Sequence, residues 1–489
     1  MTGPGVTGSG ATDSGATDSG PPLSVIDPAR TKAELRAKLT GLDAELDAWL
    51  AATTEQGMLR RHHTQIQAVA GTLKQVSAEL ATQLDRPDQG LRILDRIGSV
   101  DRRVMDLHRL WGFFRAKFAL RYVPWLEAPL VTADDLAWAC YSPVQKFVPA
   151  DRRREPPLVY FTGGTSPFLM PRGSPYVVEP LPDGSMREPE FTEAVRLMPV
   201  ALIGLPWFQV DHLPDAPLIA HEVGHAVEQD LGLGDRVRAL IEDAAPAKRR
   251  CAWSAWGAEV FADVYGTLCC GSGFARALMA LLTVHPRQVN GEVRTPAAWG
   301  SYPTRTLRVL LTAAVLAKLG VQPADQSVAD AWLAAYPDRP LTEYEADAGL
   351  VAAALVDGPY DALGKSGLTA IIGYSDDDEK TVSRLAKHLL NRTALDEGGV
   401  RHIVAAARLA YDRDRAGYAA RRAAQMVRAK IASIPSDGVR DVRGTRGAGV
   451  SGTPPEPERP ERDKHAARAL SQLIDRDDRE DADVPAQYQ

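Results

Sequence analysis

Two histidines, with a glutamate directly after the first, stand in the segment HEVGH at residues 221–225. Residues four apart lie on one face of an α-helix, about one turn from each other, so the two imidazoles can converge on one metal ion. Imidazole is a common zinc ligand, and a carboxylate beside such a site can take a proton from metal-bound water. The spacing therefore predicts that His221 and His225 bind Zn²⁺ and that Glu222 is a general base. The alternative is an ordinary buried helix with two core histidines, but buried polar groups need partners, which a metal ion supplies.

A catalytic zinc site needs a third protein ligand, and two acidic segments further along the chain offer one. In the first, Glu259 and Asp263 stand four apart among apolar residues, so they would share one face of a buried helix. Two buried carboxylates without a cation would repel each other and be costly to desolvate. Zinc removes this conflict if Glu259 binds the metal and Asp263 accepts a hydrogen bond from a ligand histidine. The second pair, Glu343 and Asp347, lies in a more polar segment that a solvated helix start also explains, so we prefer Glu259.

Together, the two preferred segments resemble the gluzincin branch of zinc metallopeptidases, the thermolysin-like arrangement of HExxH followed by ExxxD. The resemblance covers residues 215–272 and no more of the chain. It implies one Zn²⁺ per chain, held by His221, His225 and Glu259. The glutamate of HExxH would be the general base, and Asp263 of ExxxD would orient a ligand histidine. The stretch between the segments is longer than in thermolysin, so an additional loop or helix is expected there.

Peptidases of this kind also need a group that polarises the scissile carbonyl and holds the oxyanion. Tyr302, Pro303 and Arg308 resemble a His-Pro-x-x-x-x-Arg-like segment that follows the glutamate helix in some HExxH peptidases, with tyrosine in place of histidine. We expect Tyr302 to donate its hydroxyl and Arg308 to hold a carboxylate. A helix that starts at Pro303 and carries solvated arginines would explain the same residues.

The elements that must position these residues divide the chain into a helical region, a β-containing segment and a second helical region. Apolar residues at spacings of three and four predict a helical hairpin or bundle over residues 23–122. Short β-rich runs predict a small mixed sheet ahead of the motif helix, within a zincin-like catalytic domain at residues 123–430. One strand, at residues 200–206, would either offer a free edge to extended substrate or lie in the interior of the sheet. The predicted fold is therefore mainly α with a small mixed β-sheet.

The two ends of the chain have a different composition. Residues 1–22 are mostly Gly, Ser, Thr and Asp, and residues 431–489 are rich in Pro, Gly and charge, so both are predicted to be disordered tails. The beginning of the chain has no basic and apolar signal segment, and the most apolar run, at residues 309–316, is too short to span a bilayer. These features predict a cytoplasmic protein without a membrane partner.

Composition excludes some classes of function. Among 489 residues the formal net charge is only −6, so no basic surplus predicts a nucleic-acid partner. Four cysteines without a CxxC pair are too few for a disulfide framework and do not form a zinc ribbon.

Two classes of function remain, and within the first a zinc hydrolase that acts on a non-peptide amide stays an alternative to a peptidase. The first is a zinc-dependent metallohydrolase, an intracellular metallopeptidase whose substrate is a peptide or protein. The second is a helical interaction or scaffold protein with a structural or inactive zinc site, in which the N-terminal helical region binds a protein partner. A metal with an open coordination position would distinguish the first class from the second.

Overall fold

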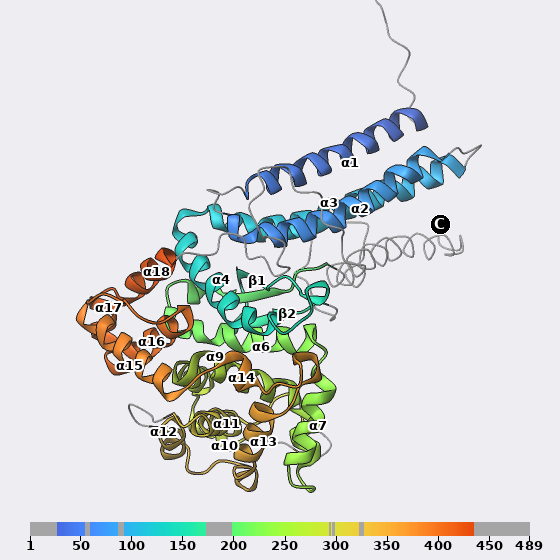
Figure 1. Cartoon of the computed structure of the whole chain (residues 1–489). Coiled ribbons are helices and arrows are strands. Elements are labelled where there is room, and N and C mark those ends of the chain that lie inside the picture. Colours follow the sequence, from blue (N-terminus) through green and yellow to red (C-terminus); the bar gives the residue numbers. More distant parts are fainter. Residues whose placement is uncertain are drawn as a thin grey trace, which may run out of the picture.

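The computed structural model describes residues 27–53, 59–86, 92–172, 198–292, 295, 299–321 and 327–434. Helices make up most of it, and three short strands form one mixed sheet (Figure 1). The prediction of a mainly α fold with a small mixed sheet is thereby confirmed. The predicted N-terminal tail and most of the predicted C-terminal tail lie outside the described residues, although a helix continues three residues past the predicted boundary at 430, to Ser433.

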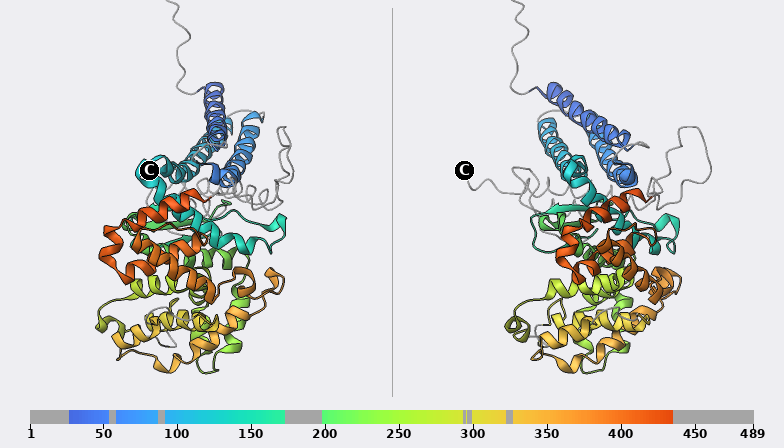
Figure 2. Two further views of the ribbon diagram at one scale, coloured as in Figure 1. Left: turned by 60° about the vertical axis from the view of Figure 1, so that its left-hand side comes forward. Right: turned by 90° about the vertical axis from the view of Figure 1, so that its left-hand side faces the viewer.

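Three long helices form the N-terminal bundle: α1 (Pro28–Ala51), α2 (His63–Asp85) and α3 (Arg92–Ala119). They pack side by side and project from one end of the protein (Figures 1 and 2). Among the leucines that predict the first helix, those at residues 35, 39, 42 and 46 are buried against the other two helices, and Leu50 is half-buried. A short 3₁₀ helix, η2 (Leu120–Tyr122), ends the bundle at the predicted boundary.

The sheet has the strand order β1-β3-β2, and β3 (Leu202–Pro206) is its central strand. β3 runs parallel to β1 (Leu158–Thr162) and antiparallel to β2 (Phe168–Met170). Of the two alternatives for the strand at 200–206, the interior strand is therefore confirmed and the free edge is wrong. Its continuous apolar run is buried on both faces, as is typical of an interior strand. Among the described strands, β2 is the edge strand that lies beside α6 (Ile219–Asp230), the helix that carries HEVGH and is here named the metal-motif helix.

The two faces of the sheet belong to two different hydrophobic cores. Leu158, Met170 and Leu202 pack into the core of the N-terminal bundle. Val159 and Ile203, on the opposite face, pack into the core of the larger helical body. Successive residues of a strand point to opposite faces, so one face of the sheet packs against the bundle and the other against the body. The sheet is therefore shared by the two cores.

The helical body holds the elements that position the candidate site: α4 (Pro124–Gln145), α6 (Ile219–Asp230), α9 (Gly257–Leu282) and α11 (Arg305–Lys318). α9 lies at its centre and packs against α6 and α11. The additional structure expected between the two motif segments is present as α7 (Gly234–Ala244) and α8 (Arg250–Ala255).

The remaining helices complete the body (Figure 1). They are α10 (Pro286–Asn290), α12 (Val328–Ala335), α13 (Asp347–Asp357), α14 (Leu368–Ile372), α15 (Asp376–Asn391), α16 (Val400–Arg413), α17 (Arg415–Ala420) and α18 (Ala423–Ser433). The other 3₁₀ helices are η1 (Arg60–His62), η3 (Ala150–Arg152), η4 (Trp207–Val210), η5 (Leu213–Leu218), η6 (Thr342–Tyr344) and η7 (Asp361–Leu363).

α9 is longer than the run at 309–316 that the sequence singled out, and it is on average more apolar than α11 (Arg305–Lys318), the helix that contains this run. It has 26 residues and is the one helix among the described residues that is long and apolar enough to cross a membrane. However, 78% of its most apolar stretch is buried inside the protein. A buried helix at the centre of a globular body can be as long and as apolar as a membrane-spanning helix. α9 is such a core helix, and it carries Glu259 and Asp263.

Candidate metal centre

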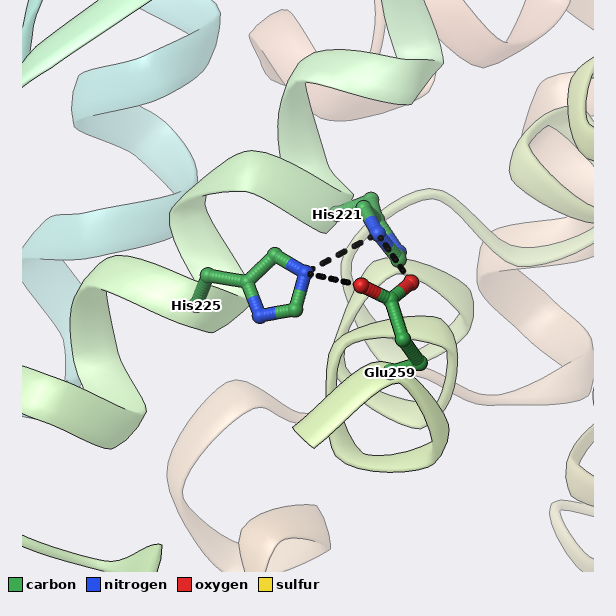
Figure 3. A group of neighbouring side chains, drawn as sticks. All are labelled: His221, His225 and Glu259. Atoms are coloured by element: carbon green, nitrogen blue, oxygen red, sulfur yellow. Dashed lines mark hydrogen bonds and ion pairs between the residues drawn. The ribbon is translucent and has the colours of Figure 1, made fainter. Parts of the chain in front are cut away.

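His221 and His225 on α6 point toward Glu259 in the first turn of α9 (Figure 3). The two helices can approach so closely because the fourth residue of HEVGH is a glycine. A Cβ atom on Gly224 would lie 2.9 Å from the Cα of Ala262, well inside normal contact. The HExxH pattern accepts any residue at its fourth position. The requirement for glycine here therefore arises from the packing of the two helices.

His221, His225 and Glu259 can each offer one ligand atom, and these atoms lie within 4.8 Å of one another. Nε2 of His225 is 3.2 Å from Nε2 of His221, and the two nitrogens lie 3.3 Å from Oε1 and Oε2 of Glu259, respectively. Zinc binds nitrogen and oxygen ligands at about 2.0–2.1 Å in tetrahedral geometry, which requires ligand atoms about 3.3–3.4 Å apart. Each observed distance therefore matches an edge of a zinc tetrahedron, although the two histidines face different oxygens of Glu259.

The hydrogen bonding of this cluster also fits a cation. Oε2 of Glu259 is buried and makes no hydrogen bond with the described residues. The two histidine Nε2 atoms face each other, and two lone pairs in that arrangement repel unless a proton or a metal ion lies between them. A metal ion held by His221, His225 and Glu259 would satisfy all of these atoms.

Asp263 lies where the sequence placed it, on the far side of the first ligand histidine. Its Oδ1 is 2.9 Å from Nδ1 of His221. At this distance the carboxylate of Asp263 and the imidazole of His221 can form an ion pair. The direction of the contact does not suit a hydrogen bond from Nδ1. A carboxylate in this position orients the imidazole and makes its other nitrogen a better ligand.

Arg308 does not reach into the cleft as a free cation. Its Nε and Nη2 atoms donate to Oδ2 and Oδ1 of Asp263 at 2.7 and 2.8 Å, and Nη2 lies 3.4 Å from Oε2 of Glu259. The carboxylates that Arg308 holds belong to the protein itself, and its expected role in catalysis stays a prediction. Arg308 is buried on α11, where a lone guanidinium would be costly, so it pairs with the nearest acidic groups.

The charges of the cluster favour a cation at its centre. Burial disfavours the charged form of His221, but contacts with Asp263 and Glu259 outweigh this and raise the pKa of His221 to about 10. Burial would also raise the pKa of Glu259, yet the two histidines hold that pKa below its usual value. Both shifts have the same cause, because the carboxylates attract positive charge on the neighbouring imidazole. Burial raises the pKa of Glu222, an effect that the histidines partly offset.

The cluster opens onto a cleft of about 380 Å³. Glu222 and Tyr302 lie on its wall together with the segment at β2, and much of the remaining lining is apolar, including Leu218, Leu278 and Leu281. Within the part of the chain that the structure describes, no fourth His, Cys, Asp or Glu joins the three ligand candidates. A metal ion held by these three side chains would therefore keep a position open toward the cleft.

Tyr302 stands at the rim of the cleft with 53% of its surface exposed. The charge of Glu259 and partial burial raise the pKa of Tyr302, so its hydroxyl keeps its proton at neutral pH. The guanidinium of Arg308 lies 5.7 Å from the centre of the tyrosine ring. This position is compatible with the expected role of Tyr302 as a hydrogen-bond donor.

The alternative acidic pair is not part of the site. Asp347 is buried on α13, where it accepts hydrogen bonds from Arg249 at 2.5 and 2.6 Å and from Nε1 of Trp253 at 3.1 Å. Glu343, in the exposed η6, is not among the residues grouped with the histidines. The structure thus brings Glu259, not Glu343, to the histidines.

Sequence reasoning missed the elements on the other wall of the cleft. β2 is only three residues long, which gives too little alternation to predict a strand. Arg172, two residues after β2, pairs with Asp230 at the end of the metal-motif helix. A contact between residues so far apart in the chain leaves no local signal in the sequence.

Comparisons of this chain with protein-family models, with curated proteins and with solved structures found no match. The functional argument therefore depends on the geometry and chemistry of the site.

Proposed function

We propose that this protein is a zinc-dependent metallohydrolase that cleaves peptide bonds. The observation that carries the proposal is the cluster of His221, His225 and Glu259, whose ligand atoms are spaced as zinc requires and whose open side faces a cleft. A structural zinc site is normally closed by four protein ligands, whereas a catalytic one keeps a position for water or substrate.

The residues around the cluster can supply the other parts of the hydrolysis. Zinc, when bound, supplies the Lewis acidity that activates a water molecule and polarises a carbonyl. Glu222 takes a proton from the attacking water and passes it to the leaving amine as the C–N bond breaks. A pKa raised by burial suits this carboxyl to both transfers. Tyr302 donates a hydrogen bond to the oxygen on which negative charge develops.

The shape of the cleft supports a peptide as the substrate. β2 lies along the cleft and is an edge of the sheet among the described strands, so an extended peptide can add to it by backbone hydrogen bonds. Apolar residues line much of the remaining wall and suit the side chains of such a peptide.

The test compares two buried glutamates on α6. Glu222 and Glu228 are each 7% exposed, but only Glu222 lines the cleft. Zinc content and hydrolysis of a quenched fluorescent peptide library would be measured for the wild type, Glu222→Gln and the matched control Glu228→Gln. We expect about one zinc per chain in all three, and a loss of at least a hundredfold in hydrolysis for Glu222→Gln alone, because general base catalysis contributes about 10²–10⁴-fold.

Two outcomes would contradict the proposal. Full hydrolytic activity in zinc-loaded Glu222→Gln would exclude the assigned mechanism. Wild-type protein that takes up no zinc after purification without chelator and reloading would exclude a zinc enzyme and favour the helical scaffold.

A further inference from the structure

A buried ion pair joins the two walls of the cleft. Arg172, just beyond β2, donates from Nε to Oδ1 of Asp230 at 3.0 Å and from Nη2 to Oδ2 at 2.8 Å. The two side chains are only 6% and 5% exposed. Asp230 is the last residue of α6, the helix that carries both histidines. One rigid bidentate contact therefore connects the edge strand to the metal-motif helix.

The same guanidinium also forms hydrogen bonds with the segments that precede the other two strands. It donates to the carbonyl oxygen of Glu155, ahead of β1, at 2.5 Å and to that of Pro199, ahead of β3. The hydroxyl of Tyr141 on α4 donates to Oδ2 of Asp230 at 2.7 Å. The carboxylate is thus fixed from two sides, and the arginine cannot move without disturbing the whole sheet.

Stability alone gives little reason for such a pair. Desolvating two charges costs several kcal/mol per ion, so well-packed apolar residues often stabilise a protein as well as a buried ion pair does. A bidentate arginine–carboxylate contact fixes both the distance and the orientation of its two partners, whereas apolar contacts are not directional. A site that must place a substrate strand relative to a metal needs both.

We propose that Arg172 and Asp230 are positioning residues that set the register between β2 and the metal-motif helix, so that a peptide bound along β2 presents its scissile bond at the metal. This inference rests on the proposed function, because it assumes a metal at the histidines and a substrate strand on β2. It assigns no chemistry to either residue, since neither lines the cleft.

A second buried pair in the chain is a matched control. Arg121 donates from Nε and Nη2 to both carboxylate oxygens of Asp134 at 2.8–3.2 Å, and Nη2 also donates to the carbonyl of Val159 in β1. The two side chains are 2% and 1% exposed. This pair anchors β1 and is absent from the cleft lining, so Arg121→Lys should disturb the core in the same way without reaching the substrate.

The experiment separates binding to the metal from binding along the strand. Acetohydroxamic acid chelates zinc without any peptide, whereas N-acetyl-trileucine hydroxamate adds a strand that can pair with β2. The affinities of both compounds for the zinc-loaded full-length chain would be measured by titration calorimetry. The variants are Arg172→Lys, the milder Tyr141→Phe, which keeps the ion pair intact, and the control Arg121→Lys.

We expect Arg172→Lys to weaken the peptide hydroxamate by about tenfold or more, since a displacement of about 1 Å can cost as much as a hundredfold. Acetohydroxamic acid should bind within about twofold of wild type. Tyr141→Phe should show a smaller change with the same selectivity, and it remains informative if Arg172→Lys does not fold. Arg121→Lys should leave both affinities unchanged.

Other results would overturn the inference. If both hydroxamates bind the wild type, and neither Arg172→Lys nor Tyr141→Phe weakens the peptide compound selectively, the pair does not position substrate. The same holds if Arg121→Lys produces the same selective loss. If neither hydroxamate binds the zinc-loaded wild type, the proposed function fails, and this inference fails with it.

Discussion

Replacing Gly224 by alanine tests whether the spacing of α6 and α9 creates the metal site. The new methyl group would lie 2.9 Å from Cα of Ala262 and 3.0 Å from Cβ of Tyr265, where carbon atoms normally stay about 3.5–4.0 Å apart. The neighbours are backbone and a Cβ atom, which cannot rotate away. The two helices must therefore separate locally by roughly 0.5–1 Å.

That separation would act on the ligand cluster directly. The histidines lie on α6 and Glu259 lies on α9, so their present distances of 3.3 Å would grow to about 4 Å, longer than an edge of the zinc tetrahedron. We expect zinc affinity to fall by about ten- to a hundredfold, as when outer partners of metal ligands are lost. Overpacking costs about 1–3 kcal/mol, and the higher helix propensity of alanine offsets about 1 kcal/mol of that. Apo-protein stability should therefore fall by only about 0–2 kcal/mol.

The assay is competition for zinc with a chromophoric chelator, with thermal unfolding of the metal-free protein measured in parallel. Gly257→Ala is the matched control, because a Cβ atom there would meet only side-chain methyl groups of Ile241 and Val237, at 3.5 and 3.7 Å. We expect the control to bind zinc like the wild type. Zinc affinity within twofold of wild type in Gly224→Ala would refute the reasoning, because the close approach of the helices would then be irrelevant to the site.

Three further predictions follow from the same contacts. Glu259→Ala should lose most bound zinc in elemental analysis, whereas Glu343→Ala should keep about one per chain; the opposite result would move the third ligand. Arg308→Met leaves Asp263 without its cation, so zinc affinity should fall about ten- to a hundredfold in the chelator assay, and an unchanged affinity would contradict this. On α15, burial would raise the pKa of Asp378, but hydrogen bonds with Ser375 and His402 lower it below 3.8. A lowered folded pKa gives stability that is present above the unfolded value and lost as pH falls through the folded one. Asp378→Asn should therefore unfold more easily than wild type at pH 7, and the difference should shrink as the pH falls through the folded pKa of Asp378; a difference that stays constant as the pH falls would exclude ionisation as its cause.

The sequence by itself predicted the candidate metal ligands and the main elements. Spacings of four put the histidines on one helix face and Glu259 and Asp263 on another, because a helical turn is a local property of the chain. The periodic leucines of the bundle likewise predicted α1 and its buried face. Both conclusions needed only the regular geometry of a helix.

Only the tertiary structure decided which of these groups meet. The sequence offered two acidic pairs. Helix packing brings Glu259 to the histidines, whereas Asp347 forms an ion pair with Arg249. It placed the strand at 200–206 inside the sheet and made β2 the edge along the cleft. It paired Arg308 with carboxylates of the protein and joined Arg172 to the end of the metal-motif helix. These outcomes depend on contacts between residues tens of positions apart, which local periodicity does not encode and which the packing of whole helices determines.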